Sequence, residues 1–475
     1  MSAGELIGWS AVKLVEHLRR GEVSPLDCLD AVEARIDDVD RAVNALPIRC
    51  FERARDHARA LMKKPAAERG LLAGLPLPIK DLTDVAGVRS TRGSLIFKDT
   101  VAAKSDILVQ RIEQAGAVIY AKSNTPEFGA GANTFNDVFG ATLNPYDMSK
   151  SAAGSSGGAA VALATGMAWL AHGSDNAGSL RTPASFCNIV GLRPTPGRVA
   201  TGHPLTIDPT LMTQGPMART VEDIALLLDA MSGDDPRDMI SKPREAVGYL
   251  ERVRAPRRPL RVAWSRDLGL TPVDPQVAAI TQKAARRFVE AGVAVEEVCP
   301  DFSGTHDSYQ ALRAHGFAVS QIKNLEAHRD KMKPEVIWNI EEGLKLTATD
   351  LVRAEHGRAA VANRVAAFFE TYDLLLCPTA IVPPFPIEER YVKSCDGVSF
   401  DSYIGWLAMA YAATTAGCPA LSLPCGFTSD GLPIGLQIIG PSNGEAKVLM
   451  GAKILEDILA LNTVAPIDPR PPKAA

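Results

Sequence analysis

Residues 149–183 constrain this chain more than any other stretch. They are dense in serine and glycine, yet they hold only one acid, Asp175, and one basic residue near each end. The part 154–158 reads GSSGG and runs directly into an apolar segment, 159–170, that predicts a buried helix. Free backbone N–H groups and the positive end of a helix dipole would then lie beside small hydroxyls.

A second turn of small residues follows the predicted helix. It spans residues 172–181 and contains Ser179, directly after Asn176, Ala177 and Gly178. Two serine turns at the two ends of one buried helix predict a single functional site.

Strand-like and helix-like segments alternate along the chain. Helices are expected at 105–116, 220–232 and 274–292, and strands at 118–121, 260–264 and 293–298. This order predicts an α/β fold, with one large domain built on a central mixed, mainly parallel sheet that helices cover on both faces. We expect N-terminal helices in residues 1–70 and a helical insertion at 300–370, while the proline-rich end, 466–475, is expected to fray.

Composition and charge favour an ordinary globular enzyme. The formal net charge is -4 and the pI is near 6.1, so nothing attracts the whole chain to nucleic acid or to an anionic membrane. The eight cysteines form no CxxC pair and no zinc-type cluster, so we expect a reducing compartment and no metal. The N-terminus reads as an amphipathic helix rather than a secretory signal, which favours the cytoplasm. The long uncharged segment 404–427 is broken by proline, glycine and threonine, and predicts a buried helix followed by a buried strand.

Lys80 has an unusual position, because it follows the short apolar strand expected at 75–79. A lysine at the end of a buried strand is either one half of an ion pair, here with Asp81 or Asp84, or a group with a chemical role. The residues alone leave both readings open.

The GSSGG turn also fits the generic GxSxG motif, in which Ser156 would be the nucleophile of an α/β-hydrolase. That motif requires a strand directly before the turn, whereas residues 144–153 are polar and turn-like. It also requires a histidine base in a late loop, whereas the last histidine of the chain is His356, in a helical stretch. The sequence therefore argues against this reading.

Several motifs together resemble the amidase signature family, a group of serine hydrolases that cleave C–N bonds. They are PIKD at 78–81, GSSGG at 154–158, GSDNAGSLRTPASFCNIVGLRPT at 173–195, QGPMARTVEDIALLL at 214–228, AGCPALSLPCGF at 416–427 and GLPIGLQIIG at 431–440. The resemblance covers most of the chain. It implies the amidase signature fold, with a signature core at 71–235 that carries the catalytic residues.

The resemblance also implies a Ser, cis-Ser, Lys triad. Carried over by motif, Lys80 is the base, Ser155 the serine that follows a cis peptide bond, and Ser179 the nucleophile. The backbone N–H groups expected to form the oxyanion hole belong to Asn176, Ala177, Gly178 and Ser179, and the supporting residues are expected to be Ser156, Ser174, Asp175 and Arg181. Two departures from the family stand out. Ala177 replaces the first of two usual glycines, and Ala153 stands where glycine is common.

The chemistry of this triad follows from general principles. A serine hydroxyl is a weak nucleophile unless a base takes its proton, and no histidine is evidently placed for that task. Lys80 can act if it is neutral, which requires its pKa to fall by roughly 3 units, and burial beside apolar residues lowers a lysine pKa in this way. Ser155 would relay the proton of Ser179 to Lys80.

We therefore expect hydrolysis of a small or aryl amide, or of a carbamate or ester, with no cofactor. The expected partner is the small-molecule substrate alone, and the protein is expected to be a monomer or homodimer. The alternative is the amidase-like glutaminase subunit of a tRNA-dependent amidotransferase, although the C-terminal third lacks the Arg-Phe-Gly type segment associated with that subunit. Aromatic residues that could line the substrate pocket, or simply fill the core, are Phe128, Phe135, Phe139, Trp338, Phe400, Tyr403 and Trp406.

Overall fold

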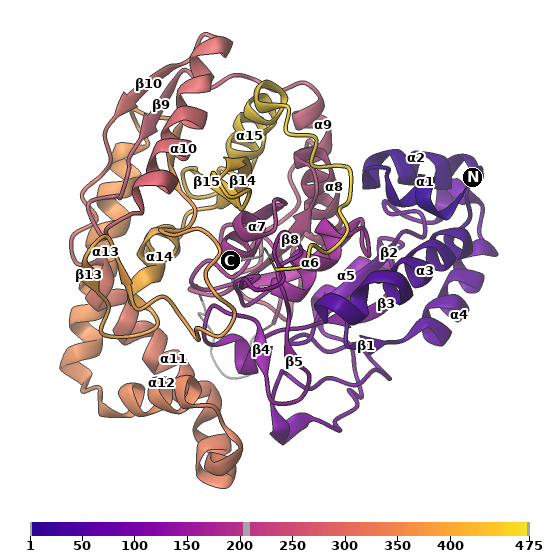
Figure 1. Ribbon diagram of the computed structural model, residues 1–475, viewed down its shortest axis with the longest axis horizontal. Helices are drawn as coiled ribbons and strands as arrows, with labels where there is room; N and C mark the ends of the chain where they lie inside the picture. Colours follow the sequence, from indigo (N-terminus) through magenta and orange to yellow (C-terminus); the bar gives the residue numbers. More distant parts are fainter. Residues whose placement is uncertain (1, 203–209, 473–475) are drawn as a thin grey trace.

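An eight-stranded sheet forms the centre of the protein (Figure 1). The computed structural model describes residues 2–202 and 210–472. The strand order is β10-β9-β11-β15-β14-β7-β8-β6. The strands are β6 (Leu170–Asp175), β7 (Val190–Arg193), β8 (Thr213–Ala218), β9 (Arg261–Trp264), β10 (Ala294–Glu297), β11 (Leu374–Pro378), β14 (Ala420–Phe427) and β15 (Pro433–Ile439).

The sheet is mixed, as predicted, but the expectation that it is mainly parallel is wrong. Only two of the described neighbouring pairs, β10 with β9 and β9 with β11, are parallel, and the other five are antiparallel. The alternation of strands and helices does produce strands that point the same way, such as β6 and β7. However, β8 inserts between those two and β15 inserts between β11 and β14, so each potential parallel pair becomes two antiparallel ones.

A smaller sheet with the order β1-β3-β2 holds the strand that ends in Lys80. Its strands are β1 (Ile48–Arg49), β2 (Pro76–Lys80) and β3 (Val118–Ser123). β2 runs parallel to β3, and Lys80 is in register with Ser123. Two hairpins complete the strands, β4 (Phe135–Asn136) with β5 (Gly140–Ala141), and β12 (Ser394–Cys395) with β13 (Val398–Ser399).

Helices cover both faces of the large sheet, which confirms the predicted α/β class. Short α7 packs on β7, β14 and β15, and α10 packs on β11, β14 and β15, whereas α8 packs on β6, β7 and β8 and also contacts α15. These helices and their neighbours are α5 (Ile107–Gln114), α6 (Gly157–Ala164), α7 (Arg181–Phe186), α8 (Val221–Met231), α9 (Tyr249–Arg254), α10 (Pro275–Arg286), α14 (Ala408–Thr415) and α15 (Glu445–Leu459). Segment 404–427 contains α14 and β14, as predicted.

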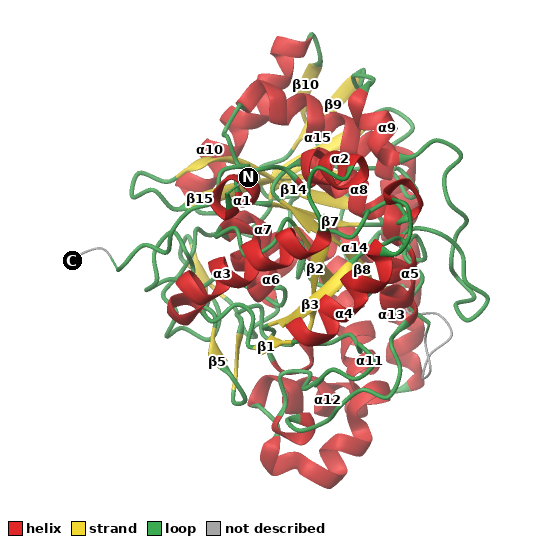
Figure 2. Cartoon of the chain, turned by 90° about the vertical axis from the view of Figure 1, so that its right-hand side faces the viewer, coloured by secondary structure: helices red, strands yellow, loops and turns green. Residues whose placement is uncertain are grey.

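The N-terminal helices and the helical segment in the second half lie on opposite sides of the molecule in Figure 1. The first group comprises α1 (Ala3–Ile7), α2 (Ala11–Arg20), α3 (Pro25–Val43) and α4 (Phe51–Met62), and the second comprises α11 (Thr305–His328), α12 (Pro334–Lys345) and α13 (Ala348–Phe368). Figure 2 shows α11 and α12 below the strands of the large sheet. Within the described residues, no helix combines the length and apolar character needed to cross a membrane.

The stretch that dominates the sequence folds differently from the prediction. The helix predicted at 159–170 ends earlier, because α6 spans Gly157–Ala164, and Leu170–Asp175 forms β6. The two serine turns therefore do not flank one helix: Ser155 precedes α6, whereas Ser179 lies between β6 and α7. β6 is held by pairing with β8, from Leu170 opposite Ala218 to Asp175 opposite Thr213, and a partner some forty residues away leaves no local sequence signal.

The C-terminal segment after α15 does not fray over its described residues. The N–H of Ile467 donates to Ala164 O at 2.9 Å, and the N–H of Arg470 donates to Pro145 O at 3.0 Å. Arg35 forms an ion pair with Asp468 at 2.7 Å. The segment is thus held against the end of α6, and only 473–475 of the expected frayed end lie outside the described residues.

Candidate active site

Lys80 lies at the centre of a cluster of serine hydroxyls. Its side chain is fully buried at the end of β2. The Nζ atom lies 2.7 Å from Ser155 Oγ, 2.9 Å from Ser156 Oγ and 3.1 Å from Ser174 Oγ. The structure therefore brings together the lysine and three of the serines that the sequence singled out.

The surroundings of Lys80 favour the neutral amine. Burial lowers the pKa of Lys80 to about 7, although the negative charge of Asp175 acts in the opposite direction. A neutral amine offers two N–H donors and one lone pair, which suits three hydroxyl neighbours. The Ser156 hydroxyl can donate to Ser174 O at 3.4 Å and so accept from Lys80, which leaves the lone pair free for the proton of Ser155.

The alternative ion pair for Lys80 is not formed. Asp81 is bound instead to Lys122, at 2.9 Å, and Asp84 to Arg92, at 2.9 Å. Among the described residues, no carboxylate oxygen lies within 4.0 Å of Lys80 Nζ.

A histidine also lies close, but it is directed to the backbone of Lys80. His172 Nδ1 accepts the main-chain N–H of Lys80 at 3.3 Å, and Nε2 lies 2.7 Å from Gln214 Oε1. Burial lowers the pKa of His172 to about 3, so the ring is neutral, with its proton on Nε2. Its nitrogens are occupied and it does not compete with Lys80 as a base.

The first serine turn lies directly against the second. The peptide bond Gly154–Ser155 is cis, and the N–H of Ser156 donates to Ser179 O at 3.2 Å. A Cβ atom on Gly129 would lie only 3.4 Å from Ser155 Oγ, so η3 (Glu127–Gly129) approaches the serine closely. Ala153, where the family favours glycine, has a φ of 56°, so here an alanine adopts the left-handed conformation.

The second serine turn is wrapped around the carboxylate of Asp175. The N–H groups of Gly178 and Leu180 each donate to this carboxylate at 3.0 Å, and Arg181 Nη2 lies 2.7 Å from it. Asn176 and Ser179 are half-buried, while the residues between them are buried. The turn therefore presents Ser179 on its open side and keeps the ion pair beneath.

These contacts also revise the expected oxyanion hole. The N–H of Gly178 is already bonded to Asp175, which removes Gly178 from the predicted donors. In the described part of the chain, the N–H groups of Asn176, Ala177 and Ser179 have no hydrogen-bond acceptor. Gly178 is still required for its conformation, because its φ is +93° and a Cβ there would lie 2.6 Å from the Cβ of Ala410.

Two arginines share the buried Asp175. Burial alone would raise the pKa of Asp175, but the guanidinium groups of Arg181 and Arg193 hold it well below its usual range. Arg193 Nη1 also donates to Asp175 O at 2.7 Å, and its own pKa is lowered by burial to about 10. The two arginines and one carboxylate leave a net positive charge beneath the turn.

Two residues that position this turn were missed by the sequence analysis. Tyr309 on α11 donates its hydroxyl proton to Asn176 Oδ1 at 2.7 Å, and Thr414 on α14 donates to Asn176 O at 2.6 Å. They lie 133 and 238 residues from Asn176 in sequence, and neither belongs to a motif that would have drawn attention to it.

The predicted pocket aromatics occupy different environments. Trp338 packs edge-to-face on Tyr403, with ring centres 5.9 Å apart, and Phe128 belongs to η3 beside Ser155. Phe135 lies between the side chains of Lys333 and Arg390. Trp406 is buried and packs against Phe385, so core packing accounts for its position. The remaining two, Phe139 and Phe400, are partly buried against the main core.

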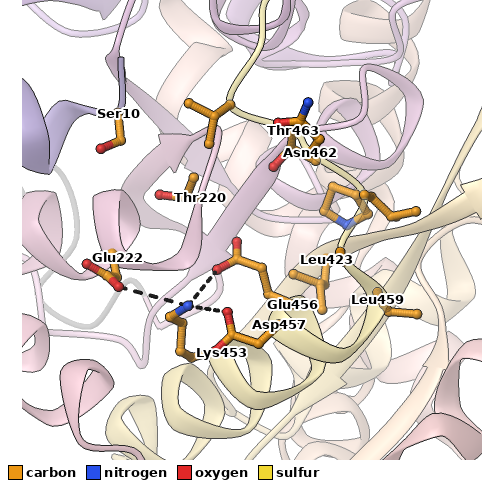
Figure 3. A pocket seen from close by; sticks show the side chains of 14 residues that line it. Ser10, Thr220, Glu222, Leu423, Lys453, Glu456, Asp457, Leu459, Asn462 and Thr463 are labelled. Atoms are coloured by element: carbon orange, nitrogen blue, oxygen red, sulfur yellow. Dashed lines mark hydrogen bonds and ion pairs between the residues drawn. The ribbon is translucent and has the colours of Figure 1, made fainter. Parts of the chain in front are cut away.

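Two cavities lie outside this cluster. One of about 370 Å³ lies between the start of α8 and the C-terminal end of α15, where Glu222, Lys453, Glu456 and Asp457 gather (Figure 3). The other, of about 130 Å³, is lined by residues that include Phe135, Lys333 and Arg390. No triad residue lines either cavity. Within the described residues, no group of three or more His, Cys, Asp or Glu side chains is arranged to hold a metal ion.

Comparison with known proteins extends over nearly the whole chain. Residues 27–449 match the family model described as Amidase. The chain is 35% identical to an acylamidase of Rhodococcus erythropolis over 94% of this chain and 95% of that protein. It is 34% identical to a glutamyl-tRNA(Gln) amidotransferase subunit of Moorella thermoacetica, over 95% of this chain and 97% of that protein.

Solved structures show the same fold. A bacterial aryl acylamidase of the amidase signature family superimposes with a TM-score of 0.88 at 27% identity, covering 95% of this chain and 96% of that chain. A 6-aminohexanoate cyclic dimer hydrolase also gives a TM-score of 0.88, at 29% identity, covering 98% of this chain and 99% of that chain.

Proposed function

Because the chain belongs to the amidase family, we propose that it hydrolyses carboxylic amides through an acyl-enzyme on Ser179, with Ser155 as proton relay and neutral Lys80 as base. The observation that carries this proposal is the buried Lys80 amine, which has three serine hydroxyls within 3.1 Å and, among the described residues, no carboxylate oxygen within 4.0 Å. A lysine that is neutral near pH 7 is a competent general base for a serine that has no histidine partner.

The first half of the reaction forms the acyl-enzyme. Ser179 Oγ attacks the amide carbonyl carbon as its proton passes to Ser155 Oγ, and the Ser155 proton passes to Lys80 Nζ. The C–N bond then breaks, and the proton returns along the same path to the leaving nitrogen, so the amine departs neutral. Both serines and Lys80 are thereby restored to their starting protonation states, apart from the ester on Ser179.

The second half repeats these transfers with water. A water molecule attacks the ester carbon, its proton passes through Ser155 to Lys80, and the proton then returns to Ser179 as the acid leaves. The N–H groups of Asn176, Ala177 and Ser179 would stabilise the oxyanion in both halves, since they are free of other acceptors in the described chain. The net positive charge of the Arg181, Arg193 and Asp175 group below the turn would favour the same oxyanion.

The substrates we propose are small or aryl amides, with carbamates and esters as additional substrates. The similarity to an acylamidase and to an aryl acylamidase supports this class. An acyl-enzyme route accepts different leaving heteroatoms once they can be protonated. We further propose that the protein acts as a cytoplasmic monomer or homodimer, without nucleic acid, membrane or metal.

A panel of neutral anilides, aliphatic amides, carbamates and esters tests this function. Purified wild type and Ser179→Ala are compared with each compound, and the intact mass of the protein is followed after rapid quenching. We expect hydrolysis of at least one anilide by the wild type alone, with a transient mass increase equal to the acyl group. Failure of every amide in the panel would refute the proposed function.

The second candidate is the glutaminase subunit of an amidotransferase. It is supported by the 34% identity to the Moorella thermoacetica amidotransferase subunit over almost the full length. Glutaminase activity that appears only with the partner subunits would favour this candidate, whereas anilide hydrolysis by the isolated chain would favour the free enzyme.

A further inference from the structure

Arg313 is a buried cation without an acidic partner. Its side chain on α11 is only 6% exposed. Of the other buried arginines, Arg181, Arg193 and Arg198 each lie within 3.4 Å of a carboxylate oxygen, whereas Arg219 donates to the backbone carbonyls of Ile7 and Trp9. For Arg313, no carboxylate within 4.0 Å is found among residues 2–202 and 210–472. Burying an unpaired guanidinium costs several kcal/mol, so this position calls for an explanation.

The contacts of Arg313 satisfy only part of its hydrogen-bonding capacity. Its Nη1 donates to Asn339 Oδ1 and its Nη2 donates to the Tyr403 hydroxyl at 2.6 Å, both neutral groups. The buried Nε has no hydrogen-bond partner among the residues that the structure describes. Rings of Phe317 and Tyr403 lie 4.7 and 5.3 Å from the guanidinium carbon. These contacts fix the position of the Arg313 guanidinium group but do not neutralise its positive charge.

An acid on the neighbouring helix α12 is already paired with other cations. Glu335, on α12 one turn before Asn339, is bound to Arg390 at 2.6 Å and lies 4.0 Å from Lys333. Two cations therefore share that carboxylate, and it forms no ion pair with Arg313.

Helix α11 links Arg313 to the proposed oxyanion hole. Tyr309 is one helical turn before Arg313 on the same face, and its hydroxyl donates to Asn176 Oδ1 at 2.7 Å. The two side chains thus leave the helix about 6 Å apart along its axis. Tyr403, predicted to line the pocket, packs on the guanidinium group of Arg313, and Trp338, predicted likewise, packs on Tyr403.

We propose that Arg313 binds a carboxylate carried by the substrate, so that the amides hydrolysed at Ser179 are anionic amides. The proposal rests on the proposed function and specifies its substrate class. The planar fork of an arginine matches a carboxylate, and a substrate anion would supply the counter-charge that the chain itself lacks.

Binding to an inactive variant tests this idea independently of catalysis. The probes are glutaric acid monoanilide, its methyl ester, and 3-(pentanoylamino)benzoic acid, which places the carboxylate on the amine side. On Ser179→Ala, we expect one of the two acids to bind roughly 10- to 100-fold more tightly than the neutral ester. The acid that gains affinity identifies the side of the substrate that carries the carboxylate.

Variants of Arg313 in the same background then separate charge recognition from folding. Ser179→Ala/Arg313→Gln should remove the preference for the acid, and Arg313→Lys should retain part of it. Arg329→Gln is the matched control, because Arg329 is an exposed arginine of the same region that pairs with Glu341; it should keep the full preference. Thermal unfolding of each variant verifies that it is folded.

The outcomes are distinct. Equal binding of both acids and the ester to Ser179→Ala overturns the inference, and this comparison needs no change at Arg313. An Arg313→Gln protein that is folded and loses acid and ester binding equally also overturns it. Failure of wild type to cleave any anilide instead refutes the proposed function, while the binding results still decide the role of Arg313.

Discussion

The hydroxyl of Tyr309 donates a hydrogen bond to the side-chain oxygen of Asn176 at 2.7 Å. This contact joins α11 to the turn that carries the proposed nucleophile. Tyr309 is itself stacked on Tyr411, with ring centres 4.4 Å apart, and the Tyr411 hydroxyl lies 2.8 Å from His306 Nδ1. The turn is therefore held from the second half of the chain as well as by Asp175 below it.

Tyr309→Phe should lower kcat about 5- to 10-fold with little change in KM, because one net hydrogen bond that orients Asn176 is lost. Steady-state kinetics on an anilide measures both constants. Tyr411→Phe is the control, since it removes a hydroxyl from the same stack without touching Asn176. A Tyr309→Phe enzyme with unchanged kcat would show that α11 does not position the turn.

Ser179→Ala should abolish turnover and the acyl adduct, and Ser155→Ala should lose several orders of magnitude in kcat, since neither variant can complete the proton path. Lys80→Ala should be nearly inactive for the same reason. Ser156→Ala tests the alternative interpretation, in which Ser156 of the GxSxG motif is the nucleophile. If that variant is dead while Ser179→Ala retains its rate, Ser156 is the nucleophile and the triad is wrong.

Activity should depend on pH through Lys80. Burial lowers its pKa to about 7, and only the neutral amine can accept a proton. We therefore expect kcat/KM to fall about tenfold per unit below pH 7 and to reach a plateau above it. A profile of kcat/KM between pH 5 and 9 with a neutral anilide provides the measurement. A rate that stays constant down to pH 5 would contradict a lysine base.

The same shift predicts an effect on stability. The pKa of Lys80 is about 7 in the folded protein and near the ordinary value of 10.5 when unfolded. Between these values the unfolded chain binds one proton more, so the free energy of unfolding rises with pH across this window. Compared with Lys80→Met, the free energy of unfolding of the wild type should fall by on the order of 4 kcal/mol as the pH is lowered from 10.5 to 7. Below pH 7 the difference should stay constant. Urea unfolding of both proteins at several pH values tests this difference, and parallel pH dependences would refute it.

Gly178→Ala should disrupt the nucleophile turn. The residue has a φ of +93°, and the added Cβ would meet Ala410 at 2.6 Å and Thr182 Oγ1 at 2.7 Å. We expect loss of acylation and a stability loss of about 2–4 kcal/mol. Gly21→Ala is the control, because Gly21 also has a positive φ, +69°, but nothing lies within 4 Å of the added Cβ. This variant should lose only about 1 kcal/mol of stability. Equal effects of the two changes would mean that the crowding at Gly178 is unimportant.

The sequence predicted those features that depend on short segments. Lys80 ends a buried strand, and segment 404–427 contains a helix followed by a strand, both as expected. The resemblance supplied the three residues proposed as the triad. In contrast, the antiparallel majority of the large sheet depends on where β8 and β15 insert, which no local pattern specifies.

The hydrogen bonds that complete the site could not be predicted from local sequence patterns either. Gly178 was assigned to the oxyanion hole because its residue type suits that role, but its N–H is taken by Asp175. Tyr309 and Arg313 look like ordinary residues of a weakly patterned helix, and only the packing of α11 against Asn176 and Asn339 gives them a role.

The attachment of the C-terminal segment determines how the chain can be handled. Ile467 and Arg470 bond to Ala164 and Pro145, on either side of the first serine turn in sequence. A reporter protein fused after residue 475 would therefore be attached to a segment that is hydrogen-bonded close to the first serine turn. Removal of the last ten residues would expose the end of α6. Affinity handles belong at the other terminus.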